Sequence, residues 1–310
     1  MGPVPIRWPL IQDLDGTGDA TPIAPVLDAF PGLQHRTSTH LKRIKRMTAD
    51  YKTIAWQRDG HIGILTLNQP DSMNALSPRL SAELADCVDR IPDEKNLRVV
   101  IFTGAGKAFS AGGDMDSFLL RSIARQENGG AGDLFSNSMS RRFLKIEIPV
   151  IAAINGAAIG GGFTLALTCD LRIAAESARF GAVFARVGLS PEYGSSYLLS
   201  RIIGLTKASE LVLTARIFDA GEALDIGLLN EVTTPDNLLP RARELAGQIA
   251  ALPPVAIRMA KRTLRHGLES TLSQALDYEE LAETHCFSTL DHQEAVRSFL
   301  EKRTPEFQGR

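Results

Sequence analysis

The stretch Ile159-Gly160-Gly161-Gly162-Phe163-Thr164 places three consecutive glycines between an apolar strand predicted at residues 150–154 and a run of helical character. Because glycine has no Cβ atom, a backbone N–H group in such a turn can approach a ligand closely. The first N–H groups of a helix also lack an acceptor within the helix and lie at the positive end of its dipole. They suit an oxygen atom that gains negative charge during a reaction. We therefore expect this turn to form half of an oxyanion hole.

A second turn of small residues, Phe109-Ser110-Ala111-Gly112-Gly113-Asp114, follows an apolar strand predicted at residues 99–103. It supplies the other half of the oxyanion hole if both turns converge on one carbonyl oxygen. Glycine-rich turns between strands and helices also occur for close packing alone, so that interpretation stays open for each turn taken separately.

Four segments, in this order and spacing, resemble the crotonase family, which is the enoyl-CoA hydratase/isomerase superfamily. They are residues 67–76 (LNQPDSMNAL), 108–114 (AFSAGGD), 155–162 (NGAAIGGG) and 169–174 (CDLRIA). Residues 216–223, 227–232 and 299–303 are also similar to the family, so the resemblance extends over residues 50–310.

The resemblance implies an α/β fold, namely a crotonase-like spiral of ββα units followed by a C-terminal helical trimerisation region. It implies an acyl-coenzyme A thioester as the partner, in a homotrimer or a dimer of trimers. In members of the family, two backbone N–H groups stabilise the enolate-like oxyanion of the thioester. The resemblance assigns this role to Gly113 and Gly161 here. By the same resemblance, Met73 and Ala75 line the coenzyme A cleft. Membership alone does not tell which reaction the chain catalyses.

The acidic residues of the family differ between its reactions. Hydratases typically carry two glutamates, at positions that here hold Thr164 and Phe184. Neither side chain can shuttle a proton as a carboxylate does, which speaks against ordinary two-glutamate hydration. Isomerases carry an acidic residue in a segment that here reads LSPEYGSSY, residues 189–197, and Glu192 fits that position.

We interpret Glu192 as the base of a double-bond isomerase, because one carboxylate can remove a proton at C2 and return it at C4. Phe163, Phe184 and Tyr193 are expected to form an apolar wall that raises its pKa and excludes water. The structural alternative is a surface glutamate favoured by the start of a helix. We expect Asp114 to lie at the edge of the substrate site and to cap the next helix.

Two other functions remain open from the sequence. One is a hydratase-like lyase with an unusual base, and the other is a catalytically silent protein that binds acyl thioesters. Thioester binding without turnover over a broad panel of enoyl-CoA compounds would favour the silent protein.

Composition excludes several other classes. A net charge of −2 provides no basic field for nucleic acid or an anionic membrane. The glycines at residues 104–106 lack the spacing and the Ser or Thr of a phosphate loop, and the six histidines show no metal-ligand spacing. We therefore expect no metal and no cofactor, since coenzyme A enters with the substrate. Three cysteines without a CxxC pair and no apolar run of about 18 residues indicate a soluble, cytoplasmic protein.

The pattern along the chain predicts three regions, residues 1–46, 47–250 and 251–310. The first is rich in proline and acidic residues and is expected to be a poorly ordered extension. A transit peptide and a translation start at Met47 are alternatives for it. The second is the spiral core, with a hairpin (53–57 and 62–67), strands (99–103, 150–154 and 171–174) and helices (77–90, 134–144, 209–214, 221–226 and 238–251). The third is a C-terminal helical region, with helices at residues 254–266 and 272–285.

Overall fold

The polypeptide alternates between two β-sheets, and this alternation positions the glycine turns. The computed structural model describes residues 50–127 and 135–310. The predictions made for residues 1–46 and for Leu134 lie outside these ranges. The larger sheet consists, in spatial order, of β1 (Ile54–Asp59), β2 (Ile62–Leu67), β3 (Val99–Gly104), β5 (Val150–Ile154), β7 (Leu171–Ala175) and β10 (Glu231–Thr233). The smaller sheet consists of β4 (Ala108–Ser110), β6 (Ala157–Ile159), β8 (Arg179–Gly181) and β9 (Phe218–Asp219).

Three successive strand pairs give the fold its spiral character. In β3–β4, β5–β6 and β7–β8, the first strand joins the larger sheet and the second joins the smaller one. Within each sheet the strands of these three pairs are parallel to one another, and β9 then joins β8 in the antiparallel direction. The antiparallel strand β1 closes one edge of the larger sheet, as the predicted hairpin requires. The chain thus has a crotonase-like α/β fold.

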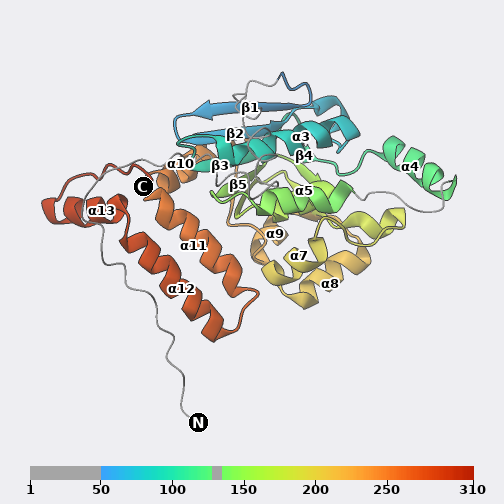
Figure 1. Cartoon of the computed structure of the whole chain (residues 1–310). Coiled ribbons are helices and arrows are strands. Elements are labelled where there is room, and N and C mark those ends of the chain that lie inside the picture. The colour runs from blue at the N-terminus through green and yellow to red at the C-terminus, as the bar shows by residue number, and fades with distance from the viewer. Residues whose placement is uncertain (1–49, 128–134) are drawn as a thin grey trace, which may run out of the picture. The chain divides into compact units, whose positions relative to one another are not determined.

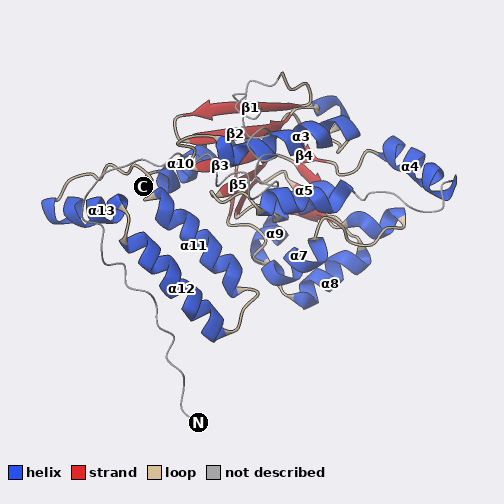
Figure 2. Cartoon of the chain, viewed as in Figure 1, coloured by secondary structure: helices blue, strands red, loops and turns tan. Residues whose placement is uncertain are grey.

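Helices surround the two sheets (Figure 2). They are α3 (Pro78–Arg90), α4 (Met115–Glu127), α5 (Phe135–Leu144), α6 (Gly161–Leu167), α7 (Ser195–Ile203), α8 (Leu205–Thr214), α9 (Ala220–Asp225), α10 (Leu238–Ala250), α11 (Pro254–Gly267), α12 (Leu272–Phe287) and α13 (Leu290–Glu301). Short 3-10 helices at Pro70–Ser72, Ile91–Asp93, Val183–Val187 and Pro235–Asn237 lie between them. No helix in the described ranges is long and apolar enough to cross a membrane.

One part of the core lies on the face of the larger sheet that α10 covers. Ile101, Ile151 and Ile173 point from three adjacent strands toward this helix and are fully buried. The alanines of α10, such as Ala242 and Ala246, let the helix approach the sheet closely. Burial of apolar side chains here stabilises the larger sheet, which holds the strand pairs in register.

The C-terminal region is helical, as predicted, and α11 and α12 run side by side (Figure 1). Asp170 connects this region to the sheets, because its carboxylate pairs with Lys261 at 2.6 Å and with Arg265 at 2.8 Å, both on α11. The same carboxylate accepts a hydrogen bond from the backbone N of Val150. Asp170 is therefore a structural residue at the junction of β5, β7 and α11.

Several elements were not predicted from the sequence. The short strands β4, β6, β8, β9 and β10 are two or three residues long, which is too short for an alternating pattern to be recognised. Helix α13 was also missed, whereas α4 is the helix that Asp114 was expected to cap and α7 begins beside Glu192 as the structural alternative requires. The polypeptide that follows β5 therefore forms β6 before it reaches the glycines, instead of passing directly into a helix.

Candidate active site

The parallel pairing of β4 with β6 brings the two glycine turns together. Ala108 pairs with Ala157, and Ser110 pairs with Ala158. Because parallel strands end at the same edge of a sheet, the residues that follow β4 and β6 emerge side by side. Gly112 has a φ of 90° and Gly160 has a φ of 52°, both in the region that side chains disfavour. The site is thus built where two three-residue strands end.

The two turns are in direct contact. A Cβ atom added to Gly112 would lie 2.6 Å from the carbonyl oxygen of Ile159 and 3.4 Å from the backbone N of Gly161. A Cβ atom added to Gly162 would collide with the backbone of Ser110. Close packing therefore explains Gly112 and Gly162, which is the structural interpretation considered above.

Gly113 and Gly161 occupy the positions expected of hydrogen-bond donors. Gly161 is the first residue of α6, so its N–H group has no acceptor within the helix. Gly113 precedes Asp114, whose Oδ1 accepts a 2.8 Å hydrogen bond from the backbone N of Ser117 and so caps α4. Within the described part of the chain, neither of the two glycine amides donates a hydrogen bond. Both N–H groups are therefore available to a ligand, and their role as oxyanion donors stays a prediction.

The segment that contains Met73 and Ala75 is fixed against the first glycine turn. The backbone N of Ala111 donates to the Met73 carbonyl at 2.9 Å, and the backbone N of Leu76 donates to the Gly112 carbonyl at 2.7 Å. The Met73 side chain is 53% exposed. Backbone groups hold this segment beside the site, and its contact with coenzyme A stays a prediction.

The side chain of Asn74 stabilises the turn in this segment. Asn74 is fully buried and has a φ of 55°. Its side-chain nitrogen donates to the carbonyls of Ala105 and Ala108, and its oxygen accepts from the backbone N of Gln69. Asn74 thus has a structural role in the turn.

Glu192 lies in the turn before α7 and is half-buried. Burial raises the pKa of its carboxyl group above the ordinary value. No ion pair or hydrogen bond connects this carboxylate to another described residue, so nothing offsets the cost of desolvating its charge. The ring of the next residue, Tyr193, lies beside Gly161, since a Cβ atom on Gly161 would be 3.4 Å from its Cε2. The structure therefore brings the Glu192 turn next to one of the two candidate donors.

Three further residues of the predicted site are buried, namely Phe163, Thr164 and Phe184. Thr164 is fully buried in α6, and its hydroxyl group donates to the Gly160 carbonyl at 3.3 Å. The Phe184 ring lies near Gly160, where a Cβ atom would be 3.9 Å from its Cε1. Phe163 packs edge-on against Phe180 and Phe218. Its contribution to a wall around Glu192, like that of Phe184, stays a prediction.

Phe118 is a neighbour of the site that the sequence analysis missed. Its ring occupies the space beside Gly113 in which a Cβ atom would lie. It belongs to the first turn of α4, whose other large apolar residues, Met115, Leu119, Leu120 and Ile123, are exposed. An apolar residue in the helix that directly follows an oxyanion turn is the signal that could have identified it.

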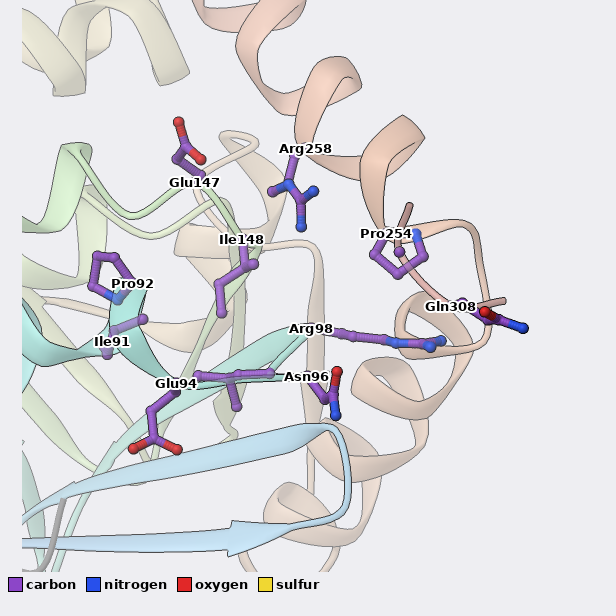
Figure 3. A pocket seen from close by; sticks show the side chains of 12 residues that line it. Ile91, Pro92, Glu94, Asn96, Arg98, Glu147, Ile148, Pro254, Arg258 and Gln308 are labelled. Atoms are coloured by element: carbon purple, nitrogen blue, oxygen red, sulfur yellow. The ribbon is translucent and has the colours of Figure 1, made fainter. Parts of the chain in front are cut away.

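A separate cavity of about 280 Å³ lies away from these residues (Figure 3). The segment between α3 and β3 contributes Glu94, Asn96 and Arg98 to its lining, and α11 contributes Pro254 and Arg258. Gly113, Gly161 and Glu192 are not among its lining residues, so it is not the candidate active site. In the described ranges, no group of three or more His, Cys, Asp and Glu side chains is placed to hold a metal ion.

The fold and the paired glycine turns define a protein of the crotonase class. The family model described as enoyl-CoA hydratase/isomerase matches residues 57–310. The chain therefore belongs to the enoyl-CoA hydratase/isomerase family.

Individual relatives agree with this assignment. The chain is 36% identical to a short-chain-enoyl-CoA hydratase of Clostridium acetobutylicum over 258 residues, which cover 83% of this chain and 98% of that protein. It is also 36% identical to a crotonyl-CoA hydratase of Syntrophomonas wolfei over 260 residues, with coverage of 83% and 98%. The crystal structure of an enoyl-CoA hydratase from Bacillus anthracis is similar, with a TM-score of 0.77, 35% identity and coverage of 84% and 100%.

Proposed function

We propose that this protein shifts the double bond of an enoyl-CoA thioester, with Glu192 as the proton shuttle and Gly113 and Gly161 as oxyanion donors. The observation that carries the proposal is the position of Glu192. It is half-buried, has no described ionic partner, and directly precedes the residue that packs beside Gly161. The family membership supports an acyl-CoA substrate, which also brings coenzyme A, so the reaction needs no separate cofactor.

In the proposed reaction, the Glu192 carboxylate removes a proton from C2 of a 3-enoyl thioester. The electron pair moves onto the thioester oxygen, which accepts hydrogen bonds from the amides of Gly113 and Gly161. The same carboxyl group then returns the proton at C4, and the double bond lies between C2 and C3. A raised pKa suits a group that must both accept and donate a proton near neutral pH.

Hydration is the second candidate, because the relatives described above are named hydratases. Hydration of the usual kind needs two carboxylates to hold and activate a water molecule. Here the two positions hold Thr164 and Phe184, and Phe184 is an apolar ring. A hydratase-like reaction would therefore rely on Glu192 alone.

The two candidates differ in where solvent atoms enter the substrate. Purified protein is incubated with 3-enoyl and 2-enoyl thioesters in deuterated water, and the products are analysed by NMR spectroscopy and mass spectrometry. We expect deuterium at C2 and C4 only. Addition of a hydroxyl group at C3 would instead support hydration, and binding without turnover would support a silent acyl-CoA-binding protein.

The variant Glu192→Gln tests the shuttle itself. We expect turnover to fall by about a hundredfold or more, because an amide cannot transfer the proton. Glu176→Gln is the matched control, since Glu176 is exposed and lies outside the site. Isomerase turnover that survives Glu192→Gln would exclude Glu192 as the base.

We also propose that the protein assembles as a homotrimer or a dimer of trimers in the cytoplasm. Large apolar side chains are exposed along the C-terminal helices, including Leu272, Leu276, Leu281 and Phe299. Several large exposed apolar side chains in one region are typical of an interface. The described cysteines, Cys87, Cys169 and Cys286, are all free thiols, which suits a reducing compartment.

A further inference from the structure

Tyr193 adopts a backbone conformation that is costly for a large side chain. Its φ is 58°, and that of the following Gly194 is 84°. The backbone N of Ser195 donates to the Glu192 carbonyl at 3.0 Å, so Tyr193 and Gly194 are the central residues of a tight turn. Two consecutive positive φ angles in such a turn usually call for glycine, asparagine or aspartate. A half-buried aromatic residue in this conformation requires compensation from its surroundings.

The compensation comes from α6. A Cβ atom on Gly161 would lie 3.4 Å from Cε2 and 3.7 Å from Cζ of the Tyr193 ring, which are ordinary contact distances. The ring therefore rests on the face of Gly161 that has no side chain, one residue after Glu192. Leu76 closes the same face, with its Cδ1 atom 3.0 Å from the added Cβ position.

We infer that Tyr193 is a positioning residue: its ring anchors the turn that carries Glu192 to Gly161, so that the base and an oxyanion donor keep a fixed separation. The inference rests on the proposed function for Glu192 and Gly161. The Glu192 carboxylate makes no hydrogen bond to a described residue that would orient it. Its orientation is thus left to the backbone of the turn and to the packing of the residue beside it.

Gly161, on which the ring packs, is itself a buried residue. Burial of Glu192 in the same place agrees with this arrangement, since its pKa is raised by desolvation and by no neighbouring charge. A displacement of the ring would let the distance between the Glu192 carboxylate and the Gly161 amide vary. Small displacements of reacting groups reduce turnover strongly.

The test compares Tyr193→Phe, which keeps the ring, with Tyr193→Gly, which removes the ring and accepts the positive φ. We expect Tyr193→Phe to lower kcat much less than Tyr193→Gly does, because it keeps the ring. Tyr193→Gly is expected to lower kcat by about tenfold or more while KM changes by less than about threefold, because positioning acts on the transition state. Tyr193→Asn, which also tolerates a positive φ, provides a second variant should Tyr193→Gly unfold.

Hydrogen–deuterium exchange at short labelling times gives a readout that does not depend on turnover. In a peptide covering residues 159–165, we expect exchange to increase in Tyr193→Gly and to remain unchanged in Tyr193→Phe. Wild-type kcat or unchanged exchange in folded Tyr193→Gly would overturn the inference. Should the wild-type protein show no isomerase turnover, the proposed function fails, and the exchange experiment alone decides whether the ring anchors the turn.

Discussion

Glu192 combines a chemical advantage with an energetic cost. A half-buried carboxylate that has no described ionic partner destabilises the folded protein when it is ionised. The neighbouring Tyr193 adds a second cost through its positive φ. Residues that reduce stability in this way are often retained for activity, and their replacement commonly stabilises a protein while it reduces function.

The stability cost of Glu192 should depend on pH. Because burial raises the pKa of Glu192 above 4.5, the folded state binds more protons than the unfolded state between the two pKa values. The free energy of unfolding therefore falls as pH rises through this window. We expect the stability of Glu192→Gln relative to the wild type to increase as pH rises above 4.5, measured by urea denaturation. Glu176→Gln is the control, and its free energy of unfolding should differ from that of the wild type by an amount that does not change with pH. A difference for Glu192→Gln that is also independent of pH would contradict the prediction.

The first hairpin and α3 are held together by one carboxylate. Glu83 of α3 accepts hydrogen bonds from the backbone N of Lys52 and Thr53 at 2.8 Å and from the Thr53 hydroxyl at 2.7 Å. Burial opposes the charge, but these hydrogen bonds and one from Arg79 outweigh it and lower the pKa of Glu83 to about 2. The carboxylate thus satisfies two backbone donors at the start of β1 and fixes the helix to the sheet.

Loss of this charge should destabilise the protein. We expect Glu83→Gln to reduce the free energy of unfolding by about 1.5–3 kcal/mol at pH 7, the range for hydrogen bonds to charged groups. Since the folded pKa is lowered, the contribution of Glu83 is present above pH 4.5 and is lost as pH falls toward 2. The variant should therefore approach the wild type at low pH in denaturant titrations. Arg79→Gln removes only an exposed ion pair and should reduce the free energy of unfolding by less than about 1 kcal/mol. An equal loss of stability in both variants would argue against a stabilising role of the hydrogen bonds from Lys52 and Thr53 to Glu83.

The sequence predicted the long elements well and the short ones poorly. Except for the three-residue β10, the strands of the larger sheet follow apolar patterns that are long enough to recognise, as do α3, α10, α11 and α12. Strands β4 and β6 were missed because three residues carry no period, although their parallel pairing is what aligns the glycine turns. The glycine positions and Glu192 could be predicted from motifs, whereas the contacts of Phe118 and Tyr193 depend on residues brought together by the fold.

At the scale of the whole molecule, the C-terminal helices present an apolar surface while α11 is attached to the core. Asp170, Lys261 and Arg265 form that attachment, and Lys261 is only 8% exposed. The exposed leucines of α12 have no comparable partner in the described ranges. Such a surface favours association with further copies of the chain.

Substitution of this surface should change the oligomeric state. Leu272 and Leu276 are four residues apart on α12 and are 77% and 55% exposed. If the proposed trimer forms through this surface, the double variant Leu272→Glu, Leu276→Glu should sediment as a smaller species than the wild type, because buried charges oppose association. The double methionine variant is the control, since it preserves volume and apolar character. A wild-type protein that sediments as a monomer would contradict the proposed assembly.

Helix α4 offers a route by which the specificity of such a protein can diverge. Its capped first turn stays beside Gly113, while Met115, Leu119, Leu120 and Ile123 contribute little to the interior. Mutations at these four positions should carry a small penalty in foldability, as surface substitutions usually do. Directed evolution toward bulkier or longer acyl groups can therefore begin with libraries at these positions, and leave the strands that hold the amide donors unaltered.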